Sequence, residues 1–100
     1  MIHVVAIITA KPGQRTAVLE HFRANVPAVR AEAGCIEYGA ATDIETMGNA
    51  TFGPDTFVVI EKWESEDHLK AHAAAPHMKA YAAKTKDMLA GRVIHVLAPV

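Results

Sequence analysis

The feature that most constrains the fold is the opening run Ile2–Ala10, in which Val, Ile and Ala occupy most positions of both alternating sets. Successive side chains of an extended strand point to opposite faces of a sheet. A strand that is apolar on both faces needs cover on both of them. The turn residues Lys11, Pro12 and Gly13 then end the segment, so the sequence predicts a first strand that is covered on each side.

The next segment, from Gln14 to Ala33, has the period of a helix. Its apolar residues recur at spacings of three and four, which places them on one helical face: Val18, Phe22, Val26, Val29 and Ala33. Pro27 lies inside this pattern, where a proline removes one backbone hydrogen bond, so we expect a kinked helix or two short ones. Gly34 stands where a helix C-cap favours a left-handed residue.

Two further β-branched and aromatic segments follow, Cys35–Asp43 and Thr56–Glu64. Both predict strands, and the residues between them (45–55) contain Gly, Asn and Pro, which are typical of a long turn. Ser65 is a good N-cap for a second helix, because Glu66 and Asp67 come next and suit the positive end of the helix dipole.

That helix is expected to run to about Ala75, and Pro76 suits the first turn of another helical segment. One face of this segment carries Met78, Tyr81 or Ala82, Thr85 and Met88. Gly91 is expected to end it, and Arg92–Ala98 predicts the last strand.

The predicted order is β-α-β-β-α-β, which is the ferredoxin-like arrangement of an α+β domain, with an antiparallel sheet and both helices on one face. One domain spans residues 1–100. Two helices cannot cover the second apolar face of four strands. A large exposed apolar face usually marks a protein contact, so we expect a homodimer in which two sheets lie against each other.

Composition excludes several classes of function. The chain has 10 Lys and Arg against 11 Asp and Glu, with no basic cluster, which argues against a nucleic-acid partner. The single cysteine, Cys35, allows no internal disulfide, and we expect it to be buried and inert. The opening apolar run is too short to span a membrane and has no signal-peptide layout, so we expect a cytoplasmic protein without a membrane partner. The single serine, Ser65, is explained as a cap, which argues against serine hydrolase chemistry.

Three segments resemble one family along most of the chain. The segments AEAGCIEY (Ala31–Tyr38) and EKWESEDHLKAHAAAPHMKAY (Glu61–Tyr81), together with KPGQ after the first strand, are similar to the antibiotic-biosynthesis-type monooxygenases. The resemblance implies a dimeric α/β barrel and a pocket between sheet and helices in each monomer. It also implies oxidation of a small phenol or quinol by dioxygen, without metal, flavin or haem.

The residues of the second matching segment offer the chemistry. Glu61 and Trp63 share one face of a strand, and an indole plate suits a planar aromatic ligand, although a core tryptophan is equally compatible with this position. For Glu61 an ion pair with Lys or Arg is favoured over catalysis. His68 and His72 are one helical turn apart, but no third zinc ligand is placed by the spacing, so we expect no metal and a solvated His68.

The resemblance matches His72 to the helix histidine of the family and His77 to its second histidine. An imidazole can accept a proton from a phenol near neutral pH and return it to a peroxide. His77 is expected to orient backbone or shape the entrance. We therefore predict His72, Trp63 and Tyr81 as catalytic residues. We predict Tyr38, His77, Glu61 and His68 as substrate-binding residues.

The leading hypothesis is a cofactor-independent monooxygenase that acts on a small aromatic substrate and dioxygen. An isomerase that moves a proton beside a carbonyl, and a non-enzymatic dimer that binds a small hydrophobe, remain open. A haem-degrading relative is disfavoured, because the resemblance would then require an Asn on the first strand and a His about one helix after Trp63. The first strand has no Asn, and the positions of Tyr81 and Ala82 hold no His. The roles of His3 and His95 also remain open.

Overall fold

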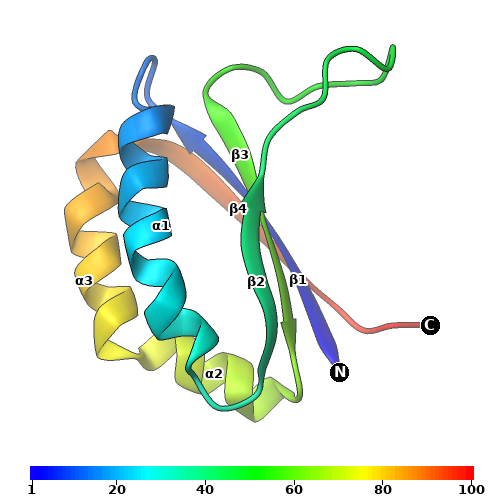
Figure 1. The fold of residues 1–100 in the computed structure, drawn as a ribbon, viewed down its shortest axis with the longest axis vertical. Helices are drawn as coiled ribbons and strands as arrows, with labels where there is room; N and C mark the ends of the chain where they lie inside the picture. Colours follow the sequence, from blue (N-terminus) through cyan, green and yellow to red (C-terminus); the bar gives the residue numbers. More distant parts are fainter.

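The computed structural model describes residues 1–100 and has four strands in one antiparallel sheet, in the order β2-β3-β1-β4. All helices lie on the same face of this sheet (Figure 1). The elements are β1 (Ile2–Ala10), α1 (Arg15–Arg30), β2 (Cys35–Ala41), β3 (Thr56–Trp63), α2 (Glu66–Ala74), α3 (Pro76–Thr85), the 3₁₀ turn η1 (Lys86–Met88) and β4 (Leu89–Leu97). The predicted ferredoxin-like α+β fold is confirmed. None of the helices has the length and apolar character that a membrane span requires.

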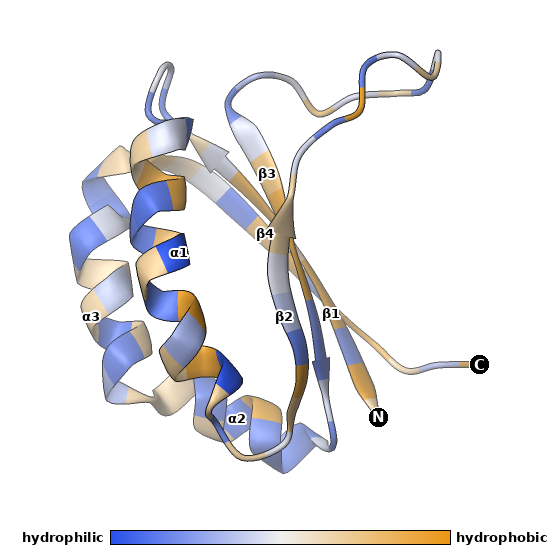
Figure 2. Cartoon of the chain, viewed as in Figure 1, coloured by the Kyte–Doolittle hydropathy of each residue, from blue (hydrophilic) through white to orange (hydrophobic).

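The core lies between the sheet and α1. Hydrophobic positions are frequent along the strands, whereas α1 alternates between polar and apolar positions (Figure 2). Phe22 on α1 is central to this packing: its ring stacks on Tyr38 with centroids 5.2 Å apart and meets Phe57 edge-on at 6.0 Å. Such aromatic pairs add to the hydrophobic gain from burial and hold α1 against the strands.

Helix α1 differs from the expectation in two ways. It is a single helix that contains Pro27, and it ends at Arg30 with Ala31 as C-cap, so the alternative of two short helices is wrong. Gly34 is not the cap. Its positive φ of 80° belongs to the turn into β2, and His68 packs so closely above it that a Cβ there would collide with the imidazole. Glycine is therefore required by the turn and by this close approach.

The helical region of α2 and α3 begins where the sequence predicts, but it ends earlier than predicted. Ser65 caps α2 by accepting a hydrogen bond from the His68 N–H, and Pro76 opens α3, as predicted. Gly91 does not end the helical region. Helix α3 stops at Thr85, and β4 begins already at Leu89, so Gly91 lies within the strand and pairs with Thr9.

The sheet face opposite the helices is uncovered. On β1 the side chains of Val4, Ala6 and Ile8 point toward the helices and are buried, so the alternate residues face away. The register places Ile60 beside Val5 on this outer face. His3 and His95 lie on the same face, paired with Leu97 and Val5.

Candidate functional site

A cavity of about 790 Å³ lies between the helix-facing side of the sheet and helices α2 and α3. This volume is within the range of pockets that hold small organic ligands. Its apolar lining comes from both layers and includes Val4, Ala6, Ile8 and Val59 from the sheet and Leu69 and Met78 from the helices. Of the predicted site residues, Tyr38, Glu61, His72 and Tyr81 line it.

His72 is held by a carboxylate at the buried side of the cavity. Its side chain projects from α2 and is only 5% exposed. Nδ1 lies 2.9 Å from Oε2 of Glu32, and the same oxygen lies 2.7 Å from Nε2 of His77. An ionised carboxylate can only accept hydrogen bonds, so the His72 Nδ1–H donates a hydrogen bond to Glu32. In a neutral imidazole this leaves Nε2 unprotonated and able to accept a proton.

Glu61 lies next to His72 on β3 and is also buried. Its Oε1 accepts a hydrogen bond of 2.9 Å from the indole Nε1–H of Trp63 and lies 3.8 Å from Nε2 of His72. The expected ion pair with Lys or Arg is wrong. Lys62 follows Glu61 on the strand, so it points to the opposite face, where it pairs with Glu37 at 3.1 Å.

Burial raises the pKa of the Glu61 carboxyl, because the charged form loses water; the Trp63 hydrogen bond and the nearby His72 partly oppose this effect. The native state thus holds this proton more tightly than the unfolded chain does. The contribution of Glu61 to stability is present below the ordinary carboxyl pKa of 4.5, and it is lost as the pH rises through the raised pKa.

We therefore expect Glu61→Gln to stabilise the fold at neutral pH. The amide keeps an acceptor for the Trp63 indole and carries no charge to bury. A gain of about 1 kcal/mol would raise the Tm by about 4–8 °C in a domain of this size. Thermal unfolding at pH 7 and at pH 4 measures this effect. The gain should shrink at pH 4, and a destabilised variant at pH 7 would contradict the account.

Trp63 lies beside the cavity and does not line it. The indole is fully buried, and its ring lies 4.6 Å from the imidazole of His72. Of the two positions that the sequence left open for Trp63, the structure has the core tryptophan, and His72 and Glu61 supply the surface that faces the cavity. Trp63 supports both of these residues, through ring packing and through its N–H.

The two tyrosines line the cavity as neutral phenols. Burial raises the pKa of Tyr81 to about 12 and raises the pKa of Tyr38 further still, with the Glu61 charge adding to the effect at Tyr38. Both hydroxyls therefore keep their protons at neutral pH and can act as hydrogen-bond donors, not as bases.

His68 and His77 do not line the cavity. His68 packs on Gly34, and its Nδ1 lies 2.7 Å from the Ser65 hydroxyl, so it is partly buried and not the solvated residue that we expected. His77 instead binds Glu32. The two helix histidines, His68 and His72, thus have separate partners. No group of three or more His, Cys, Asp or Glu side chains is arranged to hold a metal ion.

Glu32 is the residue of this site that the sequence did not indicate. It lies in the turn after α1, 40 residues before His72 and 45 before His77. No spacing rule connects these positions, and only the packing of α1 against α2 and α3 brings them together. A pair of histidines around one half-buried carboxylate is recognisable only in three dimensions.

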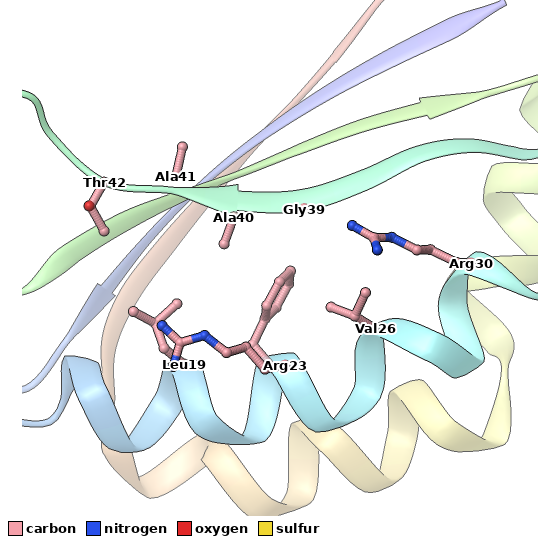
Figure 3. Close-up of a pocket in the computed structure, with 9 residues that line it drawn as sticks. Leu19, Arg23, Val26, Arg30, Gly39, Ala40, Ala41 and Thr42 are labelled. Carbon is pink, nitrogen blue, oxygen red and sulfur yellow. The ribbon is translucent and has the colours of Figure 1, made fainter.

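A second hollow, of about 400 Å³, lies between α1 and β2 and contains none of the predicted site residues. Arg23 and Arg30 flank it (Figure 3). Arg30 is already engaged, because its Nε and Nη2 both donate to the carbonyl oxygen of Tyr38, at 3.1 and 3.0 Å. No His, Cys, Tyr, Asp or Glu side chain lines this hollow.

The fold and the cavity define a class: a ferredoxin-like domain with an internal pocket that contains a carboxylate-bound histidine. The comparison with protein families agrees with this class, since the family model described as antibiotic biosynthesis monooxygenase matches residues 1–84. The chain belongs to this family.

Similar proteins extend this assignment over the whole chain. The Escherichia coli K12 protein named "Probable quinol monooxygenase YgiN" is 41% identical over 102 residues, which cover 99% of this chain and 98% of that protein. Among solved structures, PA3566 from Pseudomonas aeruginosa has a TM-score of 0.84 at 28% identity, covering 99% and 93% of the two chains. Rv0793 from Mycobacterium tuberculosis has a TM-score of 0.83 at 26% identity, covering 99% and 94%.

Proposed function

We propose that this protein is a cofactor-independent monooxygenase that oxidises a small phenol or quinol with dioxygen. One observation carries the proposal: a buried histidine lines an apolar cavity through a ring whose Nδ1 is bound by a carboxylate. Such an arrangement holds the imidazole in one tautomer and stabilises its protonated form. Family membership and the name of the E. coli relative point to the same chemistry.

The proposed first step is a proton transfer. His72 Nε2 accepts the hydroxyl proton of the substrate, and Glu32 stabilises the resulting imidazolium through Nδ1–H. The Tyr38 and Tyr81 hydroxyls orient the substrate oxygen as donors. Because Glu61, His72 and Thr85 are the buried polar groups of an otherwise largely apolar cavity, the aromatic ring is excluded from water while it is electron-rich.

The proposed oxygen step needs no group besides the substrate anion and dioxygen. The anion passes one electron to dioxygen, and the two radicals combine at a ring carbon to form a peroxide. His72 returns its proton to this peroxide, the O–O bond breaks, and the ring carbon loses its hydrogen as the carbonyl forms. One atom of dioxygen enters the quinone, and the other leaves as water with the two hydrogens.

Oxygen uptake tests the proposal. Protein treated with a chelator should consume dioxygen with some members of a panel of naphthols, hydroxyanthracenes and quinols, at rates well above their spontaneous oxidation. Boiled protein is the control for trace metals. No enzymatic uptake with any member, together with tight binding of the same compounds, would instead favour the non-oxygenase and binding functions.

We further propose that the protein is a homodimer in which the outer sheet faces pack together. Apolar side chains on this face are substantially exposed in the single chain: Ile60 by 41%, Val93 by 53% and Leu97 by 48%. The register places them on adjacent strands around Val5 and Ile7, so they form one patch.

Sedimentation velocity at micromolar concentration should accordingly give twice the chain mass of 10.7 kDa. Ile60→Asp places a charge in the middle of the patch and should shift the protein to a monomer. Ala80→Asp on the exposed side of α3 is the matched control and should stay dimeric. A monomeric wild-type protein would contradict the proposed dimer.

A further inference from the structure

The charged residues of the cavity are separated into two groups. Glu61 and His72 are buried, and they lie with Tyr38 at one end. The other charged lining residues are all cationic and exposed: Lys79 on α3, Lys86 in η1 and Arg92 on β4. Lys79 lies in the first turn of α3, near His77, whereas Lys86 and Arg92 lie on either side of the start of β4. The cavity therefore has a buried acid–base end and an open basic end that Lys86 and Arg92 form.

The basic end has no acidic side chain of its own. Glu61 is the one carboxylate that lines the cavity, and it lies at the buried end. None of the three cations takes part in an ion pair, whereas Lys62 on the outer sheet face does. Lys86 and Arg92, two cations without an ion-pair partner at one opening, create a positive potential that favours an anionic group there.

The sheet register gives the separation of the two ends. Glu61 pairs with Val4 of β1, and Arg92 pairs with Ile8, four residues further along the same strand. At about 3.3 Å per residue and about 4.8 Å between strands, the two Cα positions are about 16 Å apart. Both side chains point into the cavity from the helix-facing side, which leaves room between them for an aromatic nucleus of two or three rings.

We infer that the substrate is a hydroxylated aromatic carboxylate, with the acidic group at the end of the ring system opposite the reacting hydroxyl. This inference rests on the proposed function and specifies its substrate class. Lys86 and Arg92 receive the carboxylate at the open end. The buried end, where Glu61 lies, offers a carboxylate no Arg partner, so the orientation with the hydroxyl toward His72 is favoured. The basic end thus determines specificity and orientation, and it takes no part in the proton transfer.

Binding without turnover tests the inference separately from the oxygenase activity. Isothermal titration calorimetry at pH 7 compares 6-hydroxy-2-naphthoate with its neutral analogue 6-hydroxy-2-naphthamide, which has nearly the same shape. The carboxylate should bind about 3- to 10-fold more tightly at low salt, as expected for contacts with exposed cations. The preference should fall at 0.5 M NaCl, where such charges are screened.

The double variant K86Q/R92Q should bring the ratio of the two dissociation constants close to one. Lys84→Gln removes a charge from the same region of α3 without touching the cavity, and the wild-type preference should persist in that control. Equal binding of the two compounds by the wild type would overturn the inference, as would a preference that survives in K86Q/R92Q. Neither result would affect oxygen uptake with neutral quinols, which tests the proposed function. The substrate-class inference and the proposed function can therefore fail independently.

Discussion

Replacing His72 with alanine should lower the turnover number by about 10²-fold or more, because general-base catalysis by a positioned side chain contributes factors of this size. Neither tyrosine of the cavity can take over the proton. Tyr38 and Tyr81 hold theirs too tightly, since burial raises both of their pKa values. Steady-state kinetics of oxygen uptake, with a substrate from the active part of the panel, measures the effect.

His68→Ala is the matched control for this variant, because His68 lies on the same helix and binds Ser65 outside the cavity. It should retain wild-type turnover. His72 is nearly buried and packs on Trp63, so its removal costs stability as well, and thermal unfolding must show that the His72→Ala protein is folded at the assay temperature. A folded His72→Ala protein with full activity would remove His72 from the mechanism.

Replacing Glu32 with glutamine should lower the turnover number by about 10- to 100-fold while KM changes little. Glu32 does not line the cavity, so it acts as a positioning residue through His72. The glutamine amide can occupy the same space, but it cannot stabilise an imidazolium with a full negative charge. Separate measurement of kcat and KM distinguishes this role from a general loss of structure, which would also weaken substrate binding.

His77→Gln provides the comparison, since it removes the second histidine and leaves the bond between Glu32 and His72 in place. It should reduce turnover much less than Glu32→Gln does. Equal losses in the two variants would contradict a specific role for the charge of Glu32.

The parts of the fold that were predictable depend on residues with strong local preferences. Ser65 and Pro76 have backbone requirements that identify the starts of α2 and α3, and the structure has both as predicted. The β-branched segments likewise identified all four strands. The end of α3 was mistaken because glycine is also tolerated within a strand: the 3₁₀ turn ends the helical region first, and Gly91 pairs with Thr9.

The candidate site was only partly predictable, because its contacts join distant parts of the chain. Tyr38, Glu61, His72 and Tyr81 were selected from the sequence and do line one cavity. Their partners were not foreseen. Glu32 has no local pattern, and the bond from the Trp63 indole to Glu61 requires both side chains to lie buried on the same face of β3. Which side chains form contacts in a core depends on tertiary packing, and the sequence alone does not show that packing.

The most direct test of the central claim is the fate of the oxygen atoms. Under ¹⁸O₂, a hydroxyarene that the enzyme oxidises should yield a quinone with one heavy oxygen, observed by mass spectrometry soon after mixing and before carbonyl exchange with water. One dioxygen should be consumed for each quinone formed, without accumulation of hydrogen peroxide. An unlabelled product together with stoichiometric hydrogen peroxide would show simple electron transfer to dioxygen and would contradict a monooxygenase.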